Sequence, residues 1–458
     1  MEQKSYESLS LILNEIAQEY RRENQYFDIL YDSVSSLNIK KTSSEESTSI
    51  SDNKSGIVAR TYIDKWIEFA ITKISDIELI KKHLPKANNI KNKIEIKNGW
   101  EFNKEVKVTI NPEEIPLKQK IDKIRSIFDY LKKFDERIDP IIGYSELFTT
   151  RLFVNNEGCQ LRQVIPRCRL FIQPIAKEEG RTDFDYTSLG GEMGFEIFNG
   201  IEDRLDKVAQ NSLDMLKAEN PPSGRFPIIL DPDMAGLIAH ESFGHGLEAD
   251  QILRERSYLQ NLLNKQVASK ISNIYDNPSI SSEFGSYFFD DEGIKAQENV
   301  LVENGVLKNF IHNRITASEL DGEPKGNGRR ESFAHPIHVR MSNTYFGPGD
   351  YNLEEMISEI DKGVLLNRGY FGMEDPLGGG LQITSKKGYL IENGEKSRLL
   401  KAITLSGSVL KLLKNIDTIS NDERKLKPGT CGKGYEDFVP VTSGGSYIRV
   451  KNALISPG

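Results

Sequence analysis

Cysteine is scarce in this chain, and signals for export or membrane insertion are missing. The 458 residues include three cysteines, Cys159, Cys168 and Cys431, with no C-x-x-C pair, which is too few for a disulfide framework. The N-terminal MEQKSYESLSLILNEIAQEY lacks the basic start and apolar stretch of a signal peptide. No segment approaches the roughly 18 consecutive apolar residues of a membrane span. We therefore expect a cytoplasmic protein, whose cysteines are free to be buried hydrophobes, ligands or nucleophiles.

An excess of basic residues is also missing. The 60 Lys and Arg residues are outnumbered by 68 Asp and Glu residues, which gives a formal charge of −8, so neither nucleic acid nor a membrane surface is an expected partner. No G-x-x-x-x-G-K-[ST] motif occurs, and GNGRRE at 326–331 lacks the third glycine of a dinucleotide loop. Nucleotide binding is therefore unsupported.

The first half of the chain combines helical and extended patterns. Leu9, Ile12, Leu13 and Ile16 recur at helical spacing and predict an amphipathic helix. Residues 26–34 and 56–72 are typical of strands. Between them, the serine-rich segment 41–55 predicts an exposed loop.

Further along, apolar residues between Ile121 and Leu131 predict a second helix, and 151–172 a hairpin that turns at 155–158. A third helix over 201–219 is followed by Pro-Pro-Ser-Gly, which stops it.

The domain organisation is predicted from these elements. We expect an α+β fold with an N-terminal domain over 1–222, which a break near 110–140 divides into two subdomains. The second domain, over 223–458, is expected to be rich in strands and to carry the most informative motif of the sequence. The α+β class is expected because helices and strands mix without regular βαβ alternation.

That motif is DPDMAGLIAHESFGHGLEAD, which contains His240, Glu241 and His245. Asp231 and the proline after it predict a capped helix start. The two histidines are five residues apart, and on a straight helix this spacing turns them apart by about 140°, whereas a spacing of four turns them by about 40°. They can face one metal ion only if the helix forms a π-bulge or ends near Gly244. Gly244 and Gly246 are expected to make such a distortion easy, because glycine tolerates unusual backbone angles.

Two interpretations of the motif stay open on spacing alone. The histidines could be hydrogen-bonded core residues, or they could be two ligands of a catalytic zinc, which needs three protein ligands and an open position. Candidates for the third ligand are Glu248, Asp250 and Cys431, the last within KPGTCGKGYED, which predicts a glycine-flanked loop. Glu248 could instead orient a ligand histidine, or be an exposed acid at the end of a helix.

The remaining polar candidates are less specific. Arg329 and Arg330 could bind a carboxylate or a substrate backbone, or form ion pairs between domains. His335 and His338 are expected to face the same side of a strand, where either could contact substrate. Cys159 and Cys168 are most simply packing residues.

The second half of the sequence resembles the TldD/PmbA family of cytoplasmic zinc metalloproteases. The likeness rests on five segments in the family's order, namely DPDMAGLIAHESFGHGLEAD, GNGRRESFAHPIHVRMSNTYF, GGGLQITSKKGYLIENGE, LSGSVLKLLKNIDTISND and PGTCGKGYEDFVPV. It extends into the first half through VNNEG and GGEMGFE, whereas the first ~140 residues match only in general pattern. Because this chain keeps every element of the metal motif, it resembles the catalytic, TldD-like branch.

The resemblance implies a site and a partner. Carried over residue by residue, the metal ligands would be His240, His245 and Cys431, with Glu241 as general base, and the metal would be Zn²⁺, although the ligand set would also serve iron. It further implies an assembly with a metal-less PmbA/TldE-like partner or a second copy, and an unfolded peptide bound as an added strand. TSGGSYIRV and the region before Gly56 depart from the family pattern, which leaves substrate preference and partner identity open.

Two other functions compete with peptide hydrolysis. One is a non-catalytic metal-binding subunit that recruits substrate for a partner protease, in which four protein ligands would close the metal site. The other is an enzyme that hydrolyses an amide bond in a small molecule.

Overall fold

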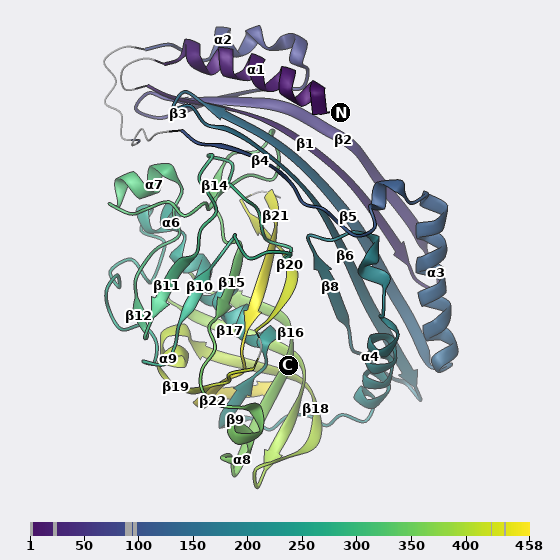
Figure 1. Cartoon of the computed structure of the whole chain (residues 1–458). Coiled ribbons are helices and arrows are strands. Elements are labelled where there is room, and N and C mark those ends of the chain that lie inside the picture. Colours follow the sequence, from purple (N-terminus) through teal and green to yellow (C-terminus); the bar gives the residue numbers. More distant parts are fainter. Residues whose placement is uncertain (1–2, 22–24, 88–93, 95–98, 423, 435–436) are drawn as a thin grey trace.

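The first half of the chain forms one long, mainly antiparallel sheet that arches over the second half (Figure 1). The computed structural model describes residues 3–21, 25–87, 94, 99–422, 424–434 and 437–458. The strands follow one another across this sheet in the order β3 (Trp66–Ile71), β2 (Glu46–Tyr62), β1 (Tyr26–Lys41), β5 (Ile138–Asn155), β6 (Gln160–Glu178) and β4 (Glu101–Glu105). Two further strands, β7 (Arg181–Phe184) and β8 (Thr187–Gly191), also pair with β6.

Helices cover the outer face of this sheet. The helices α1 (Gln3–Glu19) and α2 (Glu78–His83) lie over one end, and α3 (Leu117–Phe134) and α4 (Glu202–Met215) over the other (Figure 1). Their apolar stripes are buried, as where Ile124 and Leu131 of α3 share a cluster with Ile142 and Leu170 of the sheet. The predicted helices and the hairpin turn near residues 155–158 are confirmed.

The predicted loop over 41–55 is wrong for most of its length. Residues 46–55 belong to β2, and only the turn between Thr42 and Glu45 separates β2 from β1. The register pairs Lys41 with Glu46 and Leu37 with Ile50. Serine composition misled the prediction because the backbone hydrogen bonds to β1, rather than side-chain burial, hold this segment in a strand.

The second half consists of two six-stranded sheets and a short ribbon. One sheet runs β12 (Val306–Leu307), β11 (Asn299–Glu303), β10 (Ile274–Asp276), β15 (Asn343–Phe346), β21 (Asp437–Gly445) and β20 (Lys425–Lys433). The other runs β18 (Glu395–Ser408), β17 (Gly380–Glu392), β16 (Lys362–Glu374), β9 (Gly224–Leu230), β22 (Ile448–Pro457) and β19 (Ile416–Ile419). Because β18 also pairs with β22, five strands of the second sheet form a closed ring. The ribbon pairs β13 (Gly328–Arg329) with β14 (His338–Val339).

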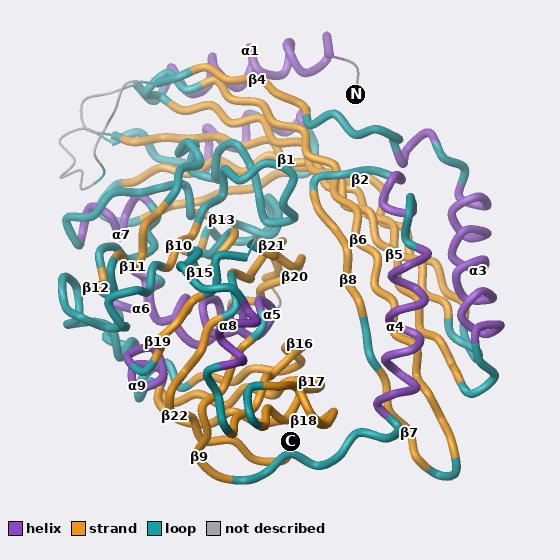
Figure 2. Tube along the Cα trace, turned by 60° about the horizontal axis from the view of Figure 1, so that its bottom comes forward, coloured by secondary structure: helices purple, strands orange, loops and turns teal. Residues whose placement is uncertain are grey.

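Short helices fill the spaces around these sheets. They are α5 (Pro232–Leu237), α6 (Ala249–Leu253), α7 (Arg314–Glu319), α8 (Leu353–Ser358) and α9 (Val409–Lys414). The first half also contains the 3₁₀ turns η1 (Ile74–Asp76), η2 (Pro112–Glu114) and η3 (Phe195–Phe198). Figure 2 shows the chain leaving α4 as a loop and entering the second half at β9. The α+β class predicted from the sequence is confirmed, and the division at residue 222 stays a prediction.

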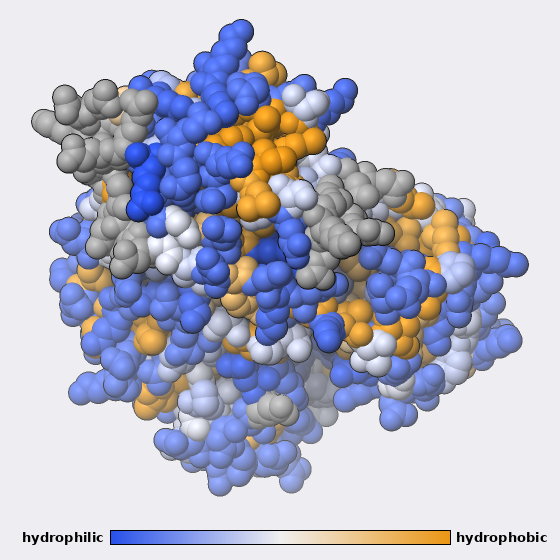
Figure 3. Space-filling model, turned by 45° about the horizontal axis from the view of Figure 1, so that its top comes forward, coloured by the Kyte–Doolittle hydropathy of each residue, from blue (hydrophilic) through white to orange (hydrophobic). Residues whose placement is uncertain are grey.

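The surface over the N-terminal helix is mainly hydrophilic but carries apolar areas (Figure 3). Leu11 and Ile12 of α1 and Ile50 of β2 are among the exposed apolar residues. Within the described ranges, no helix is long and apolar enough to cross a membrane.

Candidate metal centre

The histidine motif begins as an ordinary helix and then widens. The Asp231 side chain accepts a hydrogen bond from the Met234 N–H at 2.9 Å, and Pro232 occupies the first turn of α5, as predicted. The helix continues as the π-helical turn η4 (Ile238–Gly244) and ends in the 3₁₀ turn η5 (His245–Leu247). The predicted distortion of the helix is confirmed.

The π-helical turn brings the two imidazoles to one side. The His245 N–H donates to the His240 carbonyl, five residues back, which is the hydrogen bond that defines a π-helix. The ring centroids of His240 and His245 lie 5.4 Å apart with their planes at 83°. The extra residue between the histidines is therefore what makes them neighbours.

Gly244 serves close packing rather than backbone freedom, which corrects the expectation. Its φ and ψ of −62° and −45° are ordinary helical values. A Cβ at this position would lie 2.1 Å from Met341 Sδ and 2.8 Å from the Ala239 carbonyl oxygen. A side chain does not fit there, because Met341 packs directly on the π-helical turn.

Cys431 lies in a strand, so the predicted loop is wrong. It belongs to β20, where it pairs with Val439 of β21, and β20 is the last strand of its sheet. The neighbouring glycines suggested a loop, but the ladder to β21 holds them in an extended conformation; a Cβ on Gly432 would lie 3.0 Å from Phe438 Cε1.

The strand delivers Cys431 to the two histidines. One ligand atom from each of His240, His245 and Cys431 lies within 4.8 Å of the others, and Cys431 Sγ is 3.6 Å from His245 Nε2. His240 is 3% exposed, and neither of its ring nitrogens makes a hydrogen bond within the described part of the chain. A buried nitrogen without a partner is costly, and coordination would satisfy it. Two imidazoles and a thiolate are donors that suit zinc.

The charges of these side chains stabilise one another, as a cysteine thiolate beside a protonated imidazole. Burial of the Cys431 thiol opposes its ionisation, but the adjacent His240 and His245 outweigh burial and lower the thiol's pKa well below its ordinary value. Burial disfavours charge on His245 as well, yet Glu248 and Cys431 raise the pKa of this imidazole well above its ordinary value. The electrostatics therefore support a thiolate.

Behind His245 lies a buried carboxylate. Glu248 is 2% exposed, and its Oε2 is 3.3 Å from His245 Nδ1. Lys433 Nζ lies 2.9 Å from Glu248 and 2.8 Å from Asp250, and it also donates to the Val339 carbonyl oxygen. Burial opposes ionisation of Glu248, but Lys433 and His245 lower its pKa to about 2.

Glu248 and Asp250 therefore stand behind the donor group rather than within it. Of the alternatives for a third donor, the structure brings only Cys431 to both histidines. Contact between Glu248 and His245 fits the orienting role, not that of an exposed acid. Sequence reasoning missed Lys433, although it lies two residues after Cys431, a spacing that places both side chains on the same face of a strand.

Glu241 lies on the open side of the donor group. Its side chain is 37% exposed, and Oε2 is 3.6 Å from His245 Nε2. The strand β16 passes beside it, where a Cβ on Gly372 would lie 3.6 Å from Glu241 Cγ. The carboxylate therefore faces space that a substrate can reach.

The other polar candidates lie outside this group. Arg330 pairs with Glu68 of the first half at 2.8 Å, and Arg329 donates to the carbonyl oxygens of Met341 and Pro440. The expectation that His335 and His338 share a strand face is wrong, because β14 begins at His338 and His335 lies in the preceding turn. Cys159 and Cys168 are buried in apolar clusters, as expected.

Known proteins resemble this chain over most of its length. Residues 110–216 match the family model described as the PmbA/TldA metallopeptidase central domain, and residues 223–457 match its C-terminal domain. A metalloprotease of Methanocaldococcus jannaschii is 38% identical over 342 residues, which are 74% of this chain and 74% of the relative. A zinc metalloprotease TldD homolog of Saccharolobus solfataricus is 31% identical over 366 residues, or 79% of this chain and 78% of the relative.

Solved structures share the fold at low sequence identity. A protein of Thermotoga maritima, described as a putative modulator of a DNA gyrase, superposes with a TM-score of 0.80 at 22% identity and covers 98% of this chain and 100% of its own. TldE from Thermococcus kodakarensis has a TM-score of 0.74 at 18% identity, with 97% and 99% of the two chains covered. The two domain matches and the closely related metalloproteases show that the chain belongs to the PmbA/TldD family of metallopeptidases.

Proposed function

We propose that this chain is a zinc-dependent peptidase of the TldD type that cleaves extended or unfolded peptides. The observation that carries the proposal is the convergence of His240, His245 and Cys431 beside the exposed carboxylate of Glu241. Three protein donors leave a position open for chemistry, whereas a structural zinc site is closed by four. Iron would accept the same donors, so metal analysis is part of the test.

Each residue has a distinct role in this proposal. His240, His245 and Cys431 would hold the metal, which when bound supplies Lewis acidity toward a peptide carbonyl and a water of lowered pKa. Glu241 would accept a proton from the attacking water and deliver it to the leaving amine. Glu248 would hold the His245 ring by its Nδ1–H, with Lys433 keeping the carboxylate ionised.

We further propose that the chain works in the cytoplasm with a metal-less PmbA/TldE-like partner, or failing that with a second copy. The edge strand β20 supports recognition of an extended peptide, because an added strand is held by main-chain hydrogen bonds that tolerate many sequences. Folded proteins offer no free strand and would be excluded.

Metal content and cleavage of an unstructured peptide by the purified protein test the assignment together. We expect Glu241→Gln to keep the metal and to lower kcat by about 10²–10⁴-fold, the usual contribution of a positioned acid–base group. Glu255→Gln, a change of an exposed acid nearby, serves as the control and should leave kcat unchanged. Cys431→Ser should lower the metal content.

Three outcomes would contradict the proposal. A Glu241→Gln variant as fast as the parent would remove Glu241 from the chemistry. A bound metal without any cleavage would favour the non-catalytic subunit that recruits substrate. Cleavage that is confined to small-molecule amides, with no dependence on peptide length, would replace peptidase by amidase.

A further inference from the structure

A cavity lies between the inner face of the large sheet and the second half of the chain. Its volume is about 740 Å³, and its walls come from β1, β5 and β6 on one side and from β20, β21 and 329–335 on the other. Thr430, which directly precedes Cys431 in β20, lines the cavity. Val439, which pairs with Cys431 from β21, lines it as well. The cavity therefore reaches β20, the strand that carries Cys431, and its partner β21.

The strand β6 divides its side chains between this cavity and the outer helices. Gln163, Ile165, Arg167 and Arg169 line the cavity, whereas Cys168 and Leu170 belong to the apolar cluster under α3 and α4. Alternate residues of a strand face opposite sides of a sheet. Apolar side chains thus fill the covered face, and basic ones stand on the face that remains open.

Three of the arginines that line the cavity, Arg167, Arg169 and Arg329, form no ion pair with a described carboxylate, although Glu192 lies close enough to Arg167 for their charges to interact. Arg167 donates to the carbonyl oxygens of Phe284 and Ser286 at 2.8 and 2.5 Å. Arg167 also donates to Thr149 Oγ1 at 3.2 Å, and Arg329 donates to main-chain carbonyls at 2.6 and 2.8 Å. No described carboxylate lies within ion-pair distance of Arg167, Arg169 or Arg329.

Arg169 has the donors that a ligand would need. Its Nε donates to Ser188 Oγ at 3.2 Å, and its terminal nitrogens make no hydrogen bond within the described part of the chain. The side chain is half-buried, and burial lowers the pKa of the guanidinium. An unpaired guanidinium in such a place is matched by a planar carboxylate, which accepts two parallel hydrogen bonds.

The other charges around the cavity do not cancel this excess. Arg151 is neutralised by Asp32 and Asp291, and Glu146 pairs with Lys120. Arg330 is paired with Glu68, as described above. Glu331 accepts the Phe438 N–H at 2.6 Å but keeps its negative charge, which offsets one of the arginines. Lys54, which also lines the cavity, adds a positive charge.

We propose that this cavity binds a carboxylate of the peptide substrate, with Arg169 as the bidentate partner and with Arg167 and Arg329 supplying positive potential. This inference rests on the proposed peptidase function and assigns it a substrate class, peptides with an acidic side chain or a free C-terminal carboxylate on one side of the cleaved bond. Arg169 is a specificity-determining residue in this proposal and takes no part in the cleavage step.

Matched unstructured peptides test the proposal in two ways. The first measurement is kcat/KM for a neutral peptide, for one with glutamates on either side of the cleaved bond, and for each with a free or an amidated C-terminus. We expect about a tenfold preference for the carboxylate-bearing peptides, consistent with one charge-assisted hydrogen-bonded pair, and a smaller preference at high salt. Amidation separates the C-terminal carboxylate from acidic side chains.

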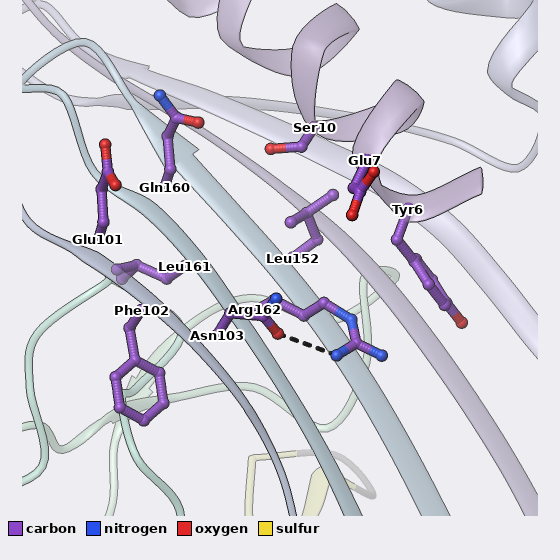
Figure 4. A pocket seen from close by; sticks show the side chains of 10 residues that line it. All are labelled: Tyr6, Glu7, Ser10, Glu101, Phe102, Asn103, Leu152, Gln160, Leu161 and Arg162. Carbon is purple, nitrogen blue, oxygen red and sulfur yellow. Dashed lines mark hydrogen bonds between the residues drawn. The ribbon is translucent and has the colours of Figure 1, made fainter. Parts of the chain in front are cut away.

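The second measurement is the affinity of the same peptides for the Glu241→Gln variant, which does not depend on turnover. Arg169→Gln should abolish the preference, and Arg169→Lys should keep part of it by retaining the charge. Arg162 offers a matched control on the same strand, because it faces the outer side of the sheet, near α1, and its guanidinium binds Asn103 (Figure 4). Arg162→Gln should leave the preference intact.

Two results would overturn the inference while leaving the peptidase function standing. One is an equal kcat/KM for acidic, neutral and amidated peptides. The other is an Arg169→Gln variant that remains folded and keeps the full preference, or that changes only the oligomeric state. If no peptide is cleaved at all, the proposed function fails, and the affinities for the Glu241→Gln variant still decide whether the cavity binds carboxylates.

Discussion

The buried and the exposed sides of the metal centre carry two glutamates from one short segment, in opposite surroundings. Glu248 is 2% exposed and held by Lys433 and His245, whereas the Glu241 side chain is 37% exposed beside Gly372. The first cannot move without leaving a charge unpaired. The second keeps access to substrate and solvent. A carboxylate with fixed partners, such as Glu248, is suited to orienting a neighbouring side chain. A carboxylate open to solvent, such as Glu241, is suited to exchanging protons.

Removing Lys433 should destabilise the buried side of the site most strongly. Lys433→Met leaves the buried Glu248 and the partly buried Asp250 without their cation, and we expect the free energy of unfolding to fall by about 3 kcal/mol. Urea unfolding at neutral pH measures this change. The matched change on the exposed side, Glu241→Gln, should stay within about 0.5 kcal/mol. Equal effects of the two substitutions would show that the buried side is not held by this ion pair.

The Glu248→Gln variant should have an intermediate effect, on metal affinity. Loss of the carboxylate behind His245 is expected to weaken metal binding by about 10–100-fold, as for other groups that orient a ligand. Competition with a chromogenic chelator measures the affinity. Unchanged affinity would mean that Glu248 does not orient His245.

The same variant has a predictable dependence on pH. Because the folded protein lowers the pKa of Glu248 from 4.5 to about 2, the stabilisation is present above pH 4.5 and is lost as the pH falls toward 2. The difference in unfolding free energy between the metal-free parent and metal-free Glu248→Gln should therefore narrow over that interval. A constant difference would contradict the ion pair.

A methyl group on the π-helical turn should lower stability without changing either glutamate. Gly244→Ala places a Cβ against Met341, and overpacking of this kind costs about 1–3 kcal/mol. Gly246→Ala is the control, because its Cβ would meet only side chains, the end of Leu259 at 3.1 Å and the Tyr258 ring at 3.2 Å, and no backbone atom. Thermal unfolding compares the two. Equal losses would show that Gly244 is not required for close packing.

The helix that carries the two histidines could be predicted from the sequence around it. The five-residue spacing of His240 and His245 requires a widened helix, and Asp231 with Pro232 marks where that helix starts. Such features depend on backbone geometry within a few residues. The strand over 46–55 was missed because its partner strand, not its own composition, decides its conformation.

Contacts between distant segments could not be predicted in the same way. Cys431 was one of three candidates for the third ligand, and the family resemblance selected it among them, but its place in an edge strand follows from pairing with β21. The pair between Arg151 and Asp291, like that between Arg314 and Glu157, joins the two halves of the chain. Nothing in the local sequence of either partner indicates the other, because burial and pairing arise only when the sheets pack.

The position of β20 has a consequence for synthesis of the protein. One strand supplies both the thiolate of Cys431 and the cation of Lys433, and Cys431 lies 186 residues after His245. A ribosome that has released the histidine motif has therefore produced only two of the three donors, and the carboxylate behind them still lacks its counter-ion. The proposed site is complete only when β20 has been translated and has paired with β21, so a metal bound there would report that the second half has folded.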